Sequence, residues 1–208
     1  GKSTFLKALQ DSSSNDFTII QEPVDEWINT KDSDNKNILD KFYQNQTRWA
    51  FTFQMNSFIS RAHKIHEKRD LSQENQLLFV ERSIYTDRYC FAANCYETNK
   101  MTQIEYDIYC RWNDWLSNQF KLRPNAYIYL KCDTNTNVER IAKRSRQGEC
   151  NIPKEYLDNL HAKHESWMKA ENDTNIPVLT LDVSTDFTDI SKMDILFKEV
   201  EEFIVNLK

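Results

Sequence analysis

An unbroken apolar run that ends in charged side chains constrains the fold of this chain most. Residues 77–80 read Leu-Leu-Phe-Val and are followed at once by Glu81, Arg82 and Ser83. Such a run is typical of a strand buried on both faces in a parallel sheet. Ligands of open α/β sheets bind outside the carboxyl ends of the strands. The charged residues therefore suit anion and metal binding, although a salt bridge at the strand end explains them equally well.

Segments of strand and helix character alternate along the chain. The strand candidates are residues 17–20, 77–80, 126–130 and 178–181, and helical patterns cover about 38–68, 86–96, 102–119, the stretch after Thr134, 153–170 and 190–207. This alternation predicts an α/β fold with a parallel sheet and helices on both faces. We expect a single domain over residues 1–208, with five strands once a strand before Gly1 is counted.

The chain opens with half of a phosphate-binding motif. Gly1-Lys2-Ser3-Thr4 matches the second half of G-x-x-x-x-G-K-[ST], and a helical pattern follows it. Such a loop normally comes directly after a buried strand. We therefore expect that the N-terminal strand and the first half of the loop are missing from this sequence.

A second carboxylate also follows a strand candidate. Glu22 lies two residues after the segment 17–20, and Pro23 cannot continue a strand ladder. Glu22 and Glu81 thus occupy equivalent places after two strands.

Two groups of polar residues on helices each have two explanations. Gln54, Ser57 and Arg61 share one helical stripe beside an apolar one, so they either face solvent or line a polar pocket. Arginines 140, 144 and 146 surround a predicted helix end. They form either a solvated basic face or a lid over polyphosphate, because Arg binds phosphate oxygens bidentately.

Composition and charge exclude some classes of protein. Of the 208 residues, 28% are charged and 39% hydrophobic, and the formal net charge is -5. The sequence has no apolar run of membrane-spanning length, and the negative charge argues against a nucleic-acid partner. The cysteines form no C-x-x-C pair, so we expect reduced thiols in an intracellular protein. The cytoplasm is the simplest location, and mitochondria or the nucleus remain compatible.

Several stretches are more specific together than any one of them alone. They are Glu22-Pro23-Val24-x-x-Trp27, Arg48-Trp49-x-Phe51-Thr52-Phe53-Gln54, Glu81-Arg82-Ser83-x-Tyr85-x-Asp87-Arg88-Tyr89, the arginines 140, 144 and 146, and Lys163-His164-Glu165-Ser166-Trp167. In them the chain resembles the deoxynucleoside kinases, most of all the deoxycytidine and deoxyguanosine branch. The resemblance implies a P-loop NTPase-like fold with an Arg-rich lid. It also implies transfer of the γ-phosphoryl group of ATP to the 5′-hydroxyl of a deoxynucleoside, in nucleotide salvage.

The resemblance assigns the phosphate donor and the metal to the start of the chain and to the lid. Backbone N–H groups of Gly1, Lys2, Ser3 and Thr4 would cradle the phosphates of ATP, with Lys2 on the β- and γ-phosphates. The Ser3 hydroxyl and the Glu81 carboxylate would hold Mg²⁺, which needs few protein ligands. The remaining donor-site matches are Arg140, Arg144 and Arg146 in the lid and Asp182 near the donor base.

The resemblance also assigns the residues that bind the deoxynucleoside, which accepts the phosphoryl group. Glu22 is the expected base for the 5′-hydroxyl proton, Arg82 offsets charge beside it, and Glu81 is a second candidate base. Gln54 is expected to bond the edge of the nucleobase. Tyr43 and Glu165 match positions that hold the 3′-hydroxyl. The expected apolar walls are Trp27, Leu39, Phe53 and Phe91.

The pairing of Arg61 with Asp87 predicts the base preference. This pair is typical of the deoxycytidine and deoxyguanosine branch, because a carboxylate accepts from an exocyclic amino group and thymine has none. We expect deoxycytidine or purine deoxynucleosides to be preferred over thymidine. Ser57 departs from the family pattern, since deoxycytidine kinases carry a small apolar residue there.

Two other functions compete with this interpretation. A nucleoside monophosphate kinase shares the phosphate loop and lid but needs extra basic residues for the acceptor phosphate. A catalytically inactive structural subunit has no need to keep Lys2, Glu22 and Arg82 together. Family members are usually homodimers, and the aromatic helix from Tyr106 to Leu116 is the expected contact.

Overall fold

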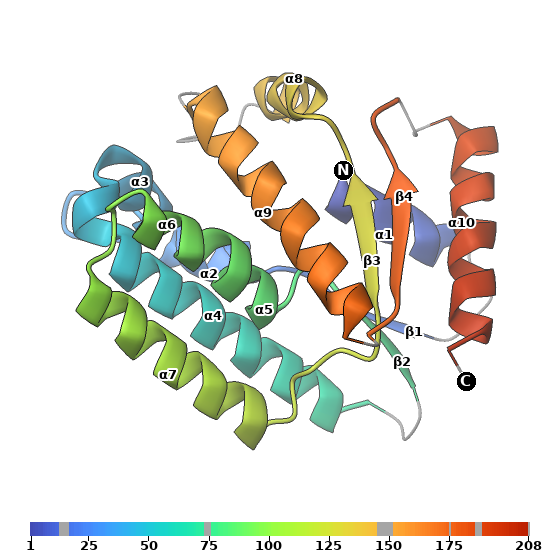
Figure 1. Ribbon diagram of the computed structural model, residues 1–208, viewed down its shortest axis with the longest axis horizontal. Coiled ribbons are helices and arrows are strands. Elements are labelled where there is room, and N and C mark those ends of the chain that lie inside the picture. The colour runs from blue at the N-terminus through green and yellow to red at the C-terminus, as the bar shows by residue number, and fades with distance from the viewer. Residues whose placement is uncertain (13–16, 73–75, 145–151, 175, 186–188, 208) are drawn as a thin grey trace.

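The protein is built from short parallel strands enclosed by helices. The computed structural model in Figure 1 describes residues 1–12, 17–72, 76–144, 152–174, 176–185 and 189–207. The strands are β1 (Phe17–Ile20), β2 (Leu77–Val80), β3 (Tyr127–Lys131) and β4 (Val178–Asp182). Each predicted strand is therefore confirmed. In the described part of the chain they form two parallel pairs, β1 with β2 and β3 with β4, rather than one five-stranded sheet.

The helices follow the predicted order with some differences. They are α1 (Lys2–Ser12), α2 (Val24–Asn29), α3 (Ile38–Gln44), α4 (Gln46–Asp70), α5 (Ile84–Thr86), the π-helical η1 (Asp87–Ala92), α6 (Ala93–Glu97), α7 (Gln103–Gln119), α8 (Thr134–Arg144), α9 (Lys154–Asp173) and α10 (Ile190–Val205). The single helix expected over 38–68 is wrong. The chain breaks at Asn45, which leaves the helical region (φ -149°, ψ 82°) and accepts a hydrogen bond from the backbone N of Arg48.

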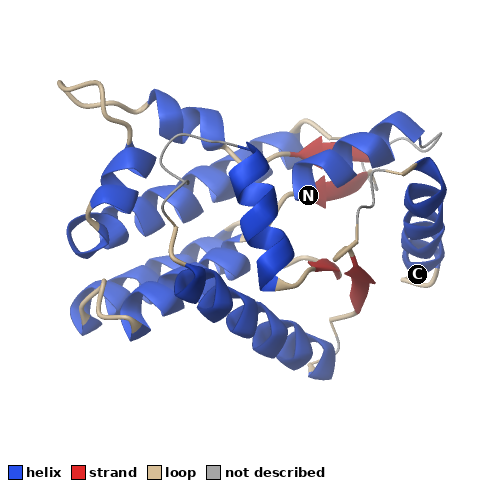
Figure 2. Cartoon of the chain, turned by 90° about the horizontal axis from the view of Figure 1, so that it is seen from above, coloured by secondary structure: helices blue, strands red, loops and turns tan. Residues whose placement is uncertain are grey.

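Helices cover both faces of each strand pair. On one side a shared cluster joins α1 and α10 to residues of both pairs, among them Phe79 and Leu130. On the other side α4 and α7 cover β1 and β2, and α9 covers β3 and β4. Figure 1 shows α9 and α10 on opposite sides of β3 and β4, and Figure 2 shows the strands enclosed by helices from above. The layered α/β architecture is thus confirmed.

Burial of β2 is less complete than the sequence predicted. Leu77 is 37% exposed, and the other three residues of the strand are only partly buried. Both faces of the strand nevertheless pack against hydrophobic clusters, with Phe79 in one and Leu78 and Val80 in the other. Leu77, at the start of the strand, is the exposed exception.

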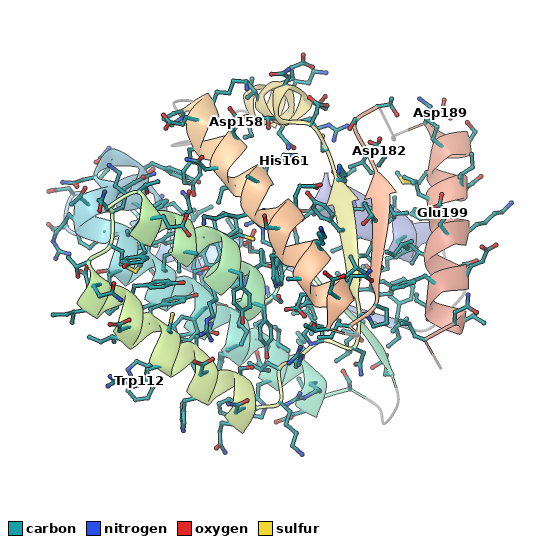
Figure 3. All side chains as sticks on the ribbon, in the orientation of Figure 1. Trp112, Asp158, His161, Asp182, Asp189 and Glu199 are labelled. Atoms are coloured by element: carbon teal, nitrogen blue, oxygen red, sulfur yellow. The ribbon has the colours of Figure 1, made fainter. Side chains whose placement is uncertain are left out.

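The aromatic residues of α7 divide between core and surface. Tyr109 is fully buried and packs edge-on against Phe58, with ring centroids 5.0 Å apart. Trp112 and Trp115 are 47% and 53% exposed, and their rings contact each other. Trp112 points away from the molecule in Figure 3. Of the aromatic residues of α7, these two tryptophans are therefore the most exposed candidates for an interface.

The described part of the chain contains free cysteines. The cysteines that the structure describes, Cys90, Cys95, Cys110 and Cys132, are all free thiols. Burial raises the pKa of Cys90 and Cys95 to about 12, so both remain protonated and inert. Among the described helices, none is both long enough and apolar enough to cross a membrane.

Candidate active site

The ends of β1 and β2 bring the two predicted carboxylates to one edge. The backbone N of Glu81 donates to the carbonyl of Ile20 at 2.8 Å, which continues the ladder past both strands. Arg82 then adopts a φ of 61°. This left-handed conformation costs a residue with a side chain about 1–2 kcal/mol, so the surrounding contacts have to hold it. Strain at this point is consistent with a functional turn.

Arg61 on α4 is the centre of the site. Its side chain is 2% exposed, and its Nε and Nη2 atoms donate to the two carboxylate oxygens of Asp87 at 2.8 and 3.2 Å. Nη1 donates to the backbone carbonyl of Glu81 at 3.0 Å, and Nη2 also donates to Oε1 of Glu22 at 2.8 Å. One guanidinium therefore joins α4, η1 and the ends of both strands.

Arg82 completes the cluster. Its Nη1 atom donates to Oε1 of Glu22 at 2.8 Å, so two guanidiniums share one carboxylate oxygen. Arg82 thus pairs with Glu22 and not with its neighbour Glu81. This excludes a simple bridge within the Glu81–Arg82 pair and leaves the Glu81 carboxylate for another role.

The two carboxylates of the cluster differ in acidity. Burial alone raises the pKa of Glu22, but Arg82, Arg61 and Lys2 outweigh it and hold that pKa well below its ordinary value. For Asp87 burial is the larger effect, and its pKa is raised although Arg61 opposes the shift. Glu22 is consequently ionised at physiological pH. It is a good hydrogen-bond acceptor but an intrinsically weak base.

Ser3 and Glu81, the residues predicted to hold Mg²⁺, contact each other. Ser3 Oγ donates to Oε1 of Glu81 at 2.8 Å. This places a hydroxyl and a carboxylate together at the first turn of α1. The described residues contain no cluster of three His, Cys, Asp or Glu side chains that suits a metal. A pair of oxygen ligands nevertheless fits Mg²⁺, which keeps water and phosphate oxygens as its other ligands.

The predicted apolar walls fall in two places. Trp27, Leu39 and Phe53 belong to one cluster, in which the Trp27 and Phe53 rings meet edge-on at 5.5 Å. Tyr43, predicted to hold the 3′-hydroxyl, borders the same cluster. Trp27 Nε1 donates to Ser60 Oγ at 2.9 Å, which fixes the indole, and the Arg61 guanidinium lies 5.8 Å from the indole centroid. Phe91 lies elsewhere, with the Arg82 guanidinium 4.7 Å from its ring centroid.

The polar stripe of α4 faces inward. Gln54, Ser57 and Arg61 are 1%, 4% and 2% exposed, so the solvated alternative is wrong. None of the side-chain hydrogen bonds among the described residues involves the amide of Gln54. Because a buried amide without a partner is costly, this group is well suited to bind a ligand.

Other predicted residues do not join this cluster. Glu165 pairs with Lys131 at the end of β3 at 2.6 Å. Arg140 donates to the carbonyls of Val183 and Thr185, which ties α8 to the segment after β4. Asp182 ends β4 and accepts from the backbone N of Ser184 (Figure 3). Arg146 and the side chain of Arg144 lie outside the described residues.

Sequence reasoning missed two structural features near the site. The short helix α2 follows Pro23 and carries Trp27; its signal was a Pro before Asp25 and Glu26, which suit a helix N-terminus. The π-helical turn η1 carries Asp87 and Phe91. π-Helical turns frequently occur at functional sites, but no simple residue pattern announces them.

Glu22→Gln should lower the free energy of unfolding in a pH-dependent way. The substitution leaves the buried Arg61 and Arg82 undercompensated, which costs about 3 kcal/mol at pH 7. Because the folded pKa of Glu22 lies below the value of 4.5 of an unperturbed glutamate, its stabilisation is present above pH 4.5 and is lost as the pH falls further. Urea unfolding of both proteins between pH 7 and about pH 2.5 measures the difference.

The exposed Glu26 of α2 provides the control. Glu26→Gln should change the unfolding free energy by less than about 0.5 kcal/mol at every pH. A Glu22→Gln difference that stays constant from pH 5 down to about pH 2.5 would contradict the depressed pKa.

Comparisons with known proteins agree with this geometry. The family model described as "Deoxynucleoside kinase" matches residues 1–205. Human deoxycytidine kinase is 38% identical in an alignment of 232 positions that covers 100% of this chain and 88% of the relative. A mitochondrial deoxyguanosine kinase of Xenopus laevis is 33% identical over 100% of this chain and 86% of the relative. A probable deoxycytidine kinase of fowlpox virus is 30% identical, with 100% and 85% covered. The chain belongs to the deoxynucleoside kinase family.

Proposed function

We propose that this kinase transfers the γ-phosphoryl group of ATP to the 5′-hydroxyl of deoxycytidine or of a purine deoxynucleoside, for nucleotide salvage. The observation that carries the proposal is the ionised carboxylate of Glu22, held by Arg61 and Arg82 beside the Ser3–Glu81 pair. Phosphoryl transfer needs mainly positioning and charge stabilisation, and this cluster supplies both.

The donor side would be built from the start of α1. Backbone N–H groups of Gly1 to Thr4 would bind the phosphates of ATP at the positive end of the helix, with the Lys2 ammonium on the transferred group. Bound Mg²⁺ would neutralise phosphate charge, held by Ser3 and Glu81. The lid arginines Arg144 and Arg146 and the donor-base residue Asp182 are part of the same proposal.

The acceptor side would be organised by Glu22. Both guanidiniums contact Oε1 of this carboxylate, and no hydrogen bond of the described residues reaches Oε2. Oε2 would accept the hydrogen bond of the 5′-hydroxyl and orient its oxygen. A loose transition state requires little deprotonation of the nucleophile beforehand. A weak but always ionised base therefore suffices, and Glu81 is free to serve the metal.

The nucleoside would lie between the apolar cluster and Arg61. Trp27, Leu39 and Phe53 offer the walls, with Phe91 across the site, and Gln54 offers an unused amide to the base edge. Asp87 would accept from an exocyclic amino group while Arg61 fixes its orientation. For the 3′-hydroxyl we retain Tyr43, which borders this cluster, and Glu165, whose Oε2 accepts from Lys131 while its buried Oε1 has no hydrogen-bond partner among the described residues.

The finer architecture is also a proposal. Both strand pairs pack against one hydrophobic cluster with α1 and α10. This supports a single domain in which a fifth strand joins the pairs into one sheet.

The cytoplasm is the proposed location, with mitochondria or the nucleus as alternatives.

Two competing functions fit the site less well. A nucleoside monophosphate acceptor would bring a phosphate dianion towards the ionised Glu22, which like-charge repulsion disfavours. An inactive structural subunit would not need the strained Arg82 or the buried Arg61 network. The experiments below include both alternatives.

Glu22→Gln should abolish most of the catalytic turnover. We expect kcat to fall at least about 100-fold, because a neutral amide cannot take the hydroxyl proton. The KM for ATP should change less than about twofold, because Glu22 contacts the acceptor. Steady-state kinetics with deoxycytidine measure both, with Glu26→Gln as control. Turnover near that of the wild type would remove Glu22 from the role of base.

A panel of four deoxynucleosides and dCMP tests the substrate class. We expect kcat/KM for deoxycytidine or a purine deoxynucleoside to exceed that for thymidine by at least about tenfold, since Asp87 has no amino group to accept from in thymine. Preferred use of thymidine would refute the specificity. Faster phosphorylation of dCMP than of deoxycytidine would favour a monophosphate kinase, and no turnover at all would favour the inactive subunit.

We also propose a homodimer that buries the exposed tryptophans of α7. Light scattering at micromolar concentration should give the mass of a dimer for the wild type and of a monomer for Trp112→Glu, because a charge buried at an interface is costly. Ile195→Glu is the control, since Ile195 is 60% exposed on α10. A wild-type monomer would refute the dimer.

A further inference from the structure

His164 on α9 lies in a row of rings behind the catalytic cluster. The ring of Phe91 meets His164 edge-on, with centroids 6.1 Å apart and planes at 87°. The ring of Tyr129 on β3 lies nearly parallel to it, at 6.3 Å and 7°. These separations are in the range of favourable aromatic contacts. The imidazole thus lies between Tyr129 on β3 and Phe91, which borders the site.

Phe91 in turn contacts a catalytic residue. The Cζ atom of Arg82 lies 4.7 Å from the centroid of Phe91, within the range of a cation–π contact. The hydrogen bond from Arg82 to Glu22 holds the other side of the guanidinium. Two contacts therefore fix Arg82, one polar and one aromatic. The aromatic contact depends on where the Phe91 ring is held.

The imidazole of His164 is neutral and has one defined tautomer. Its Nδ1 atom lies 2.7 Å from the carbonyl oxygen of Leu160, which can only accept, so Nδ1 carries the proton. Burial, together with Arg82 and Lys2, lowers the pKa of His164 to about 4 although the Leu160 carbonyl opposes the shift. A neutral ring can pack behind Phe91 without adding a third cation to this region.

We propose that His164 is a positioning residue that holds the Arg82 guanidinium in place through the ring of Phe91. This inference rests on the proposed catalytic role of Arg82. Glu165, the neighbouring residue assigned by resemblance, is bound to Lys131. The imidazole of His164 thus adds a second role to this stretch, because it acts on the catalytic arginine and not on the substrate.

Two substitutions test whether the aromatic ring at position 164 is what matters for turnover. His164→Leu removes the aromatic edge behind Phe91, and we expect kcat to fall about tenfold while KM for both substrates stays within about twofold. His164→Phe keeps a neutral ring and should keep kcat within about twofold. His161→Leu, on the same helix (Figure 3), is the control and should leave kcat unchanged. If His164→Leu does not fold, His164→Asn serves as the ringless variant.

A measurement without substrate tests the same contact. In the ligand-free protein the Nε–H signal of Arg82 should be shifted upfield by the ring current of Phe91. We expect this shift to persist in His164→Phe and to be reduced by at least half in the ringless variant. An unchanged shift, or equal kcat losses in the Phe and ringless variants, would overturn the proposal.

A double-mutant cycle distinguishes this inference from the proposed function. Arg82→Lys alone tests the role of Arg82, and unchanged kcat in that variant would refute the proposed mechanism. If Arg82→Lys is impaired, His164→Leu should lower kcat less than twofold in its background, since the positioned group is already lost. Fully additive losses would refute the positioning role and leave the kinase function intact.

Discussion

The site depends on one buried guanidinium. Arg61 reaches Glu22 after β1, the carbonyl of Glu81 after β2 and the carboxylate of Asp87 in η1. A lysine could not replace it, because only a planar fork with five donors serves three partners at fixed angles. The burial of this charge is costly, and it is offset only because all three partners are present. The same side chain therefore sets the positions of Glu22, Glu81 and Asp87, the residues proposed as base, metal ligand and specificity residue.

This arrangement also explains how one cluster holds two carboxylates of different character. Glu22 faces Arg61, Arg82 and Lys2, whereas Asp87 is fully buried and pairs with Arg61 alone. The pKa of the first is lowered and that of the second is raised. Paired groups whose environments separate their pKa values commonly divide chemical roles. In the proposed mechanism the division is between a carboxylate that receives the reacting hydroxyl, Glu22, and one that recognises the nucleobase, Asp87.

The sequence predicted much of this, and the failures have physical reasons. Strand positions were correct because short apolar runs bounded by polar residues are strong local signals. The break at Asn45 and the π-helical turn were missed because capping by one side chain and tertiary packing decide them. Likewise, periodicity placed Gln54, Ser57 and Arg61 on one stripe, but only the fold decided that this stripe is buried. Contacts between distant segments, such as Ser3 with Glu81, followed only from the family resemblance.

The stretch Lys163 to Trp167 shows what a motif match alone does not determine. A matched motif identifies which residues lie near a site, but not which of them acts, because adjacent residues on a helix point about 100° apart. In α9 the Glu165 carboxylate turns towards Lys131, and the ring of His164 turns towards Phe91. A residue packed behind a catalytic side chain limits how far that side chain departs from its productive position. For a transfer reaction governed by positioning, such a residue contributes to rate although it never touches the substrate.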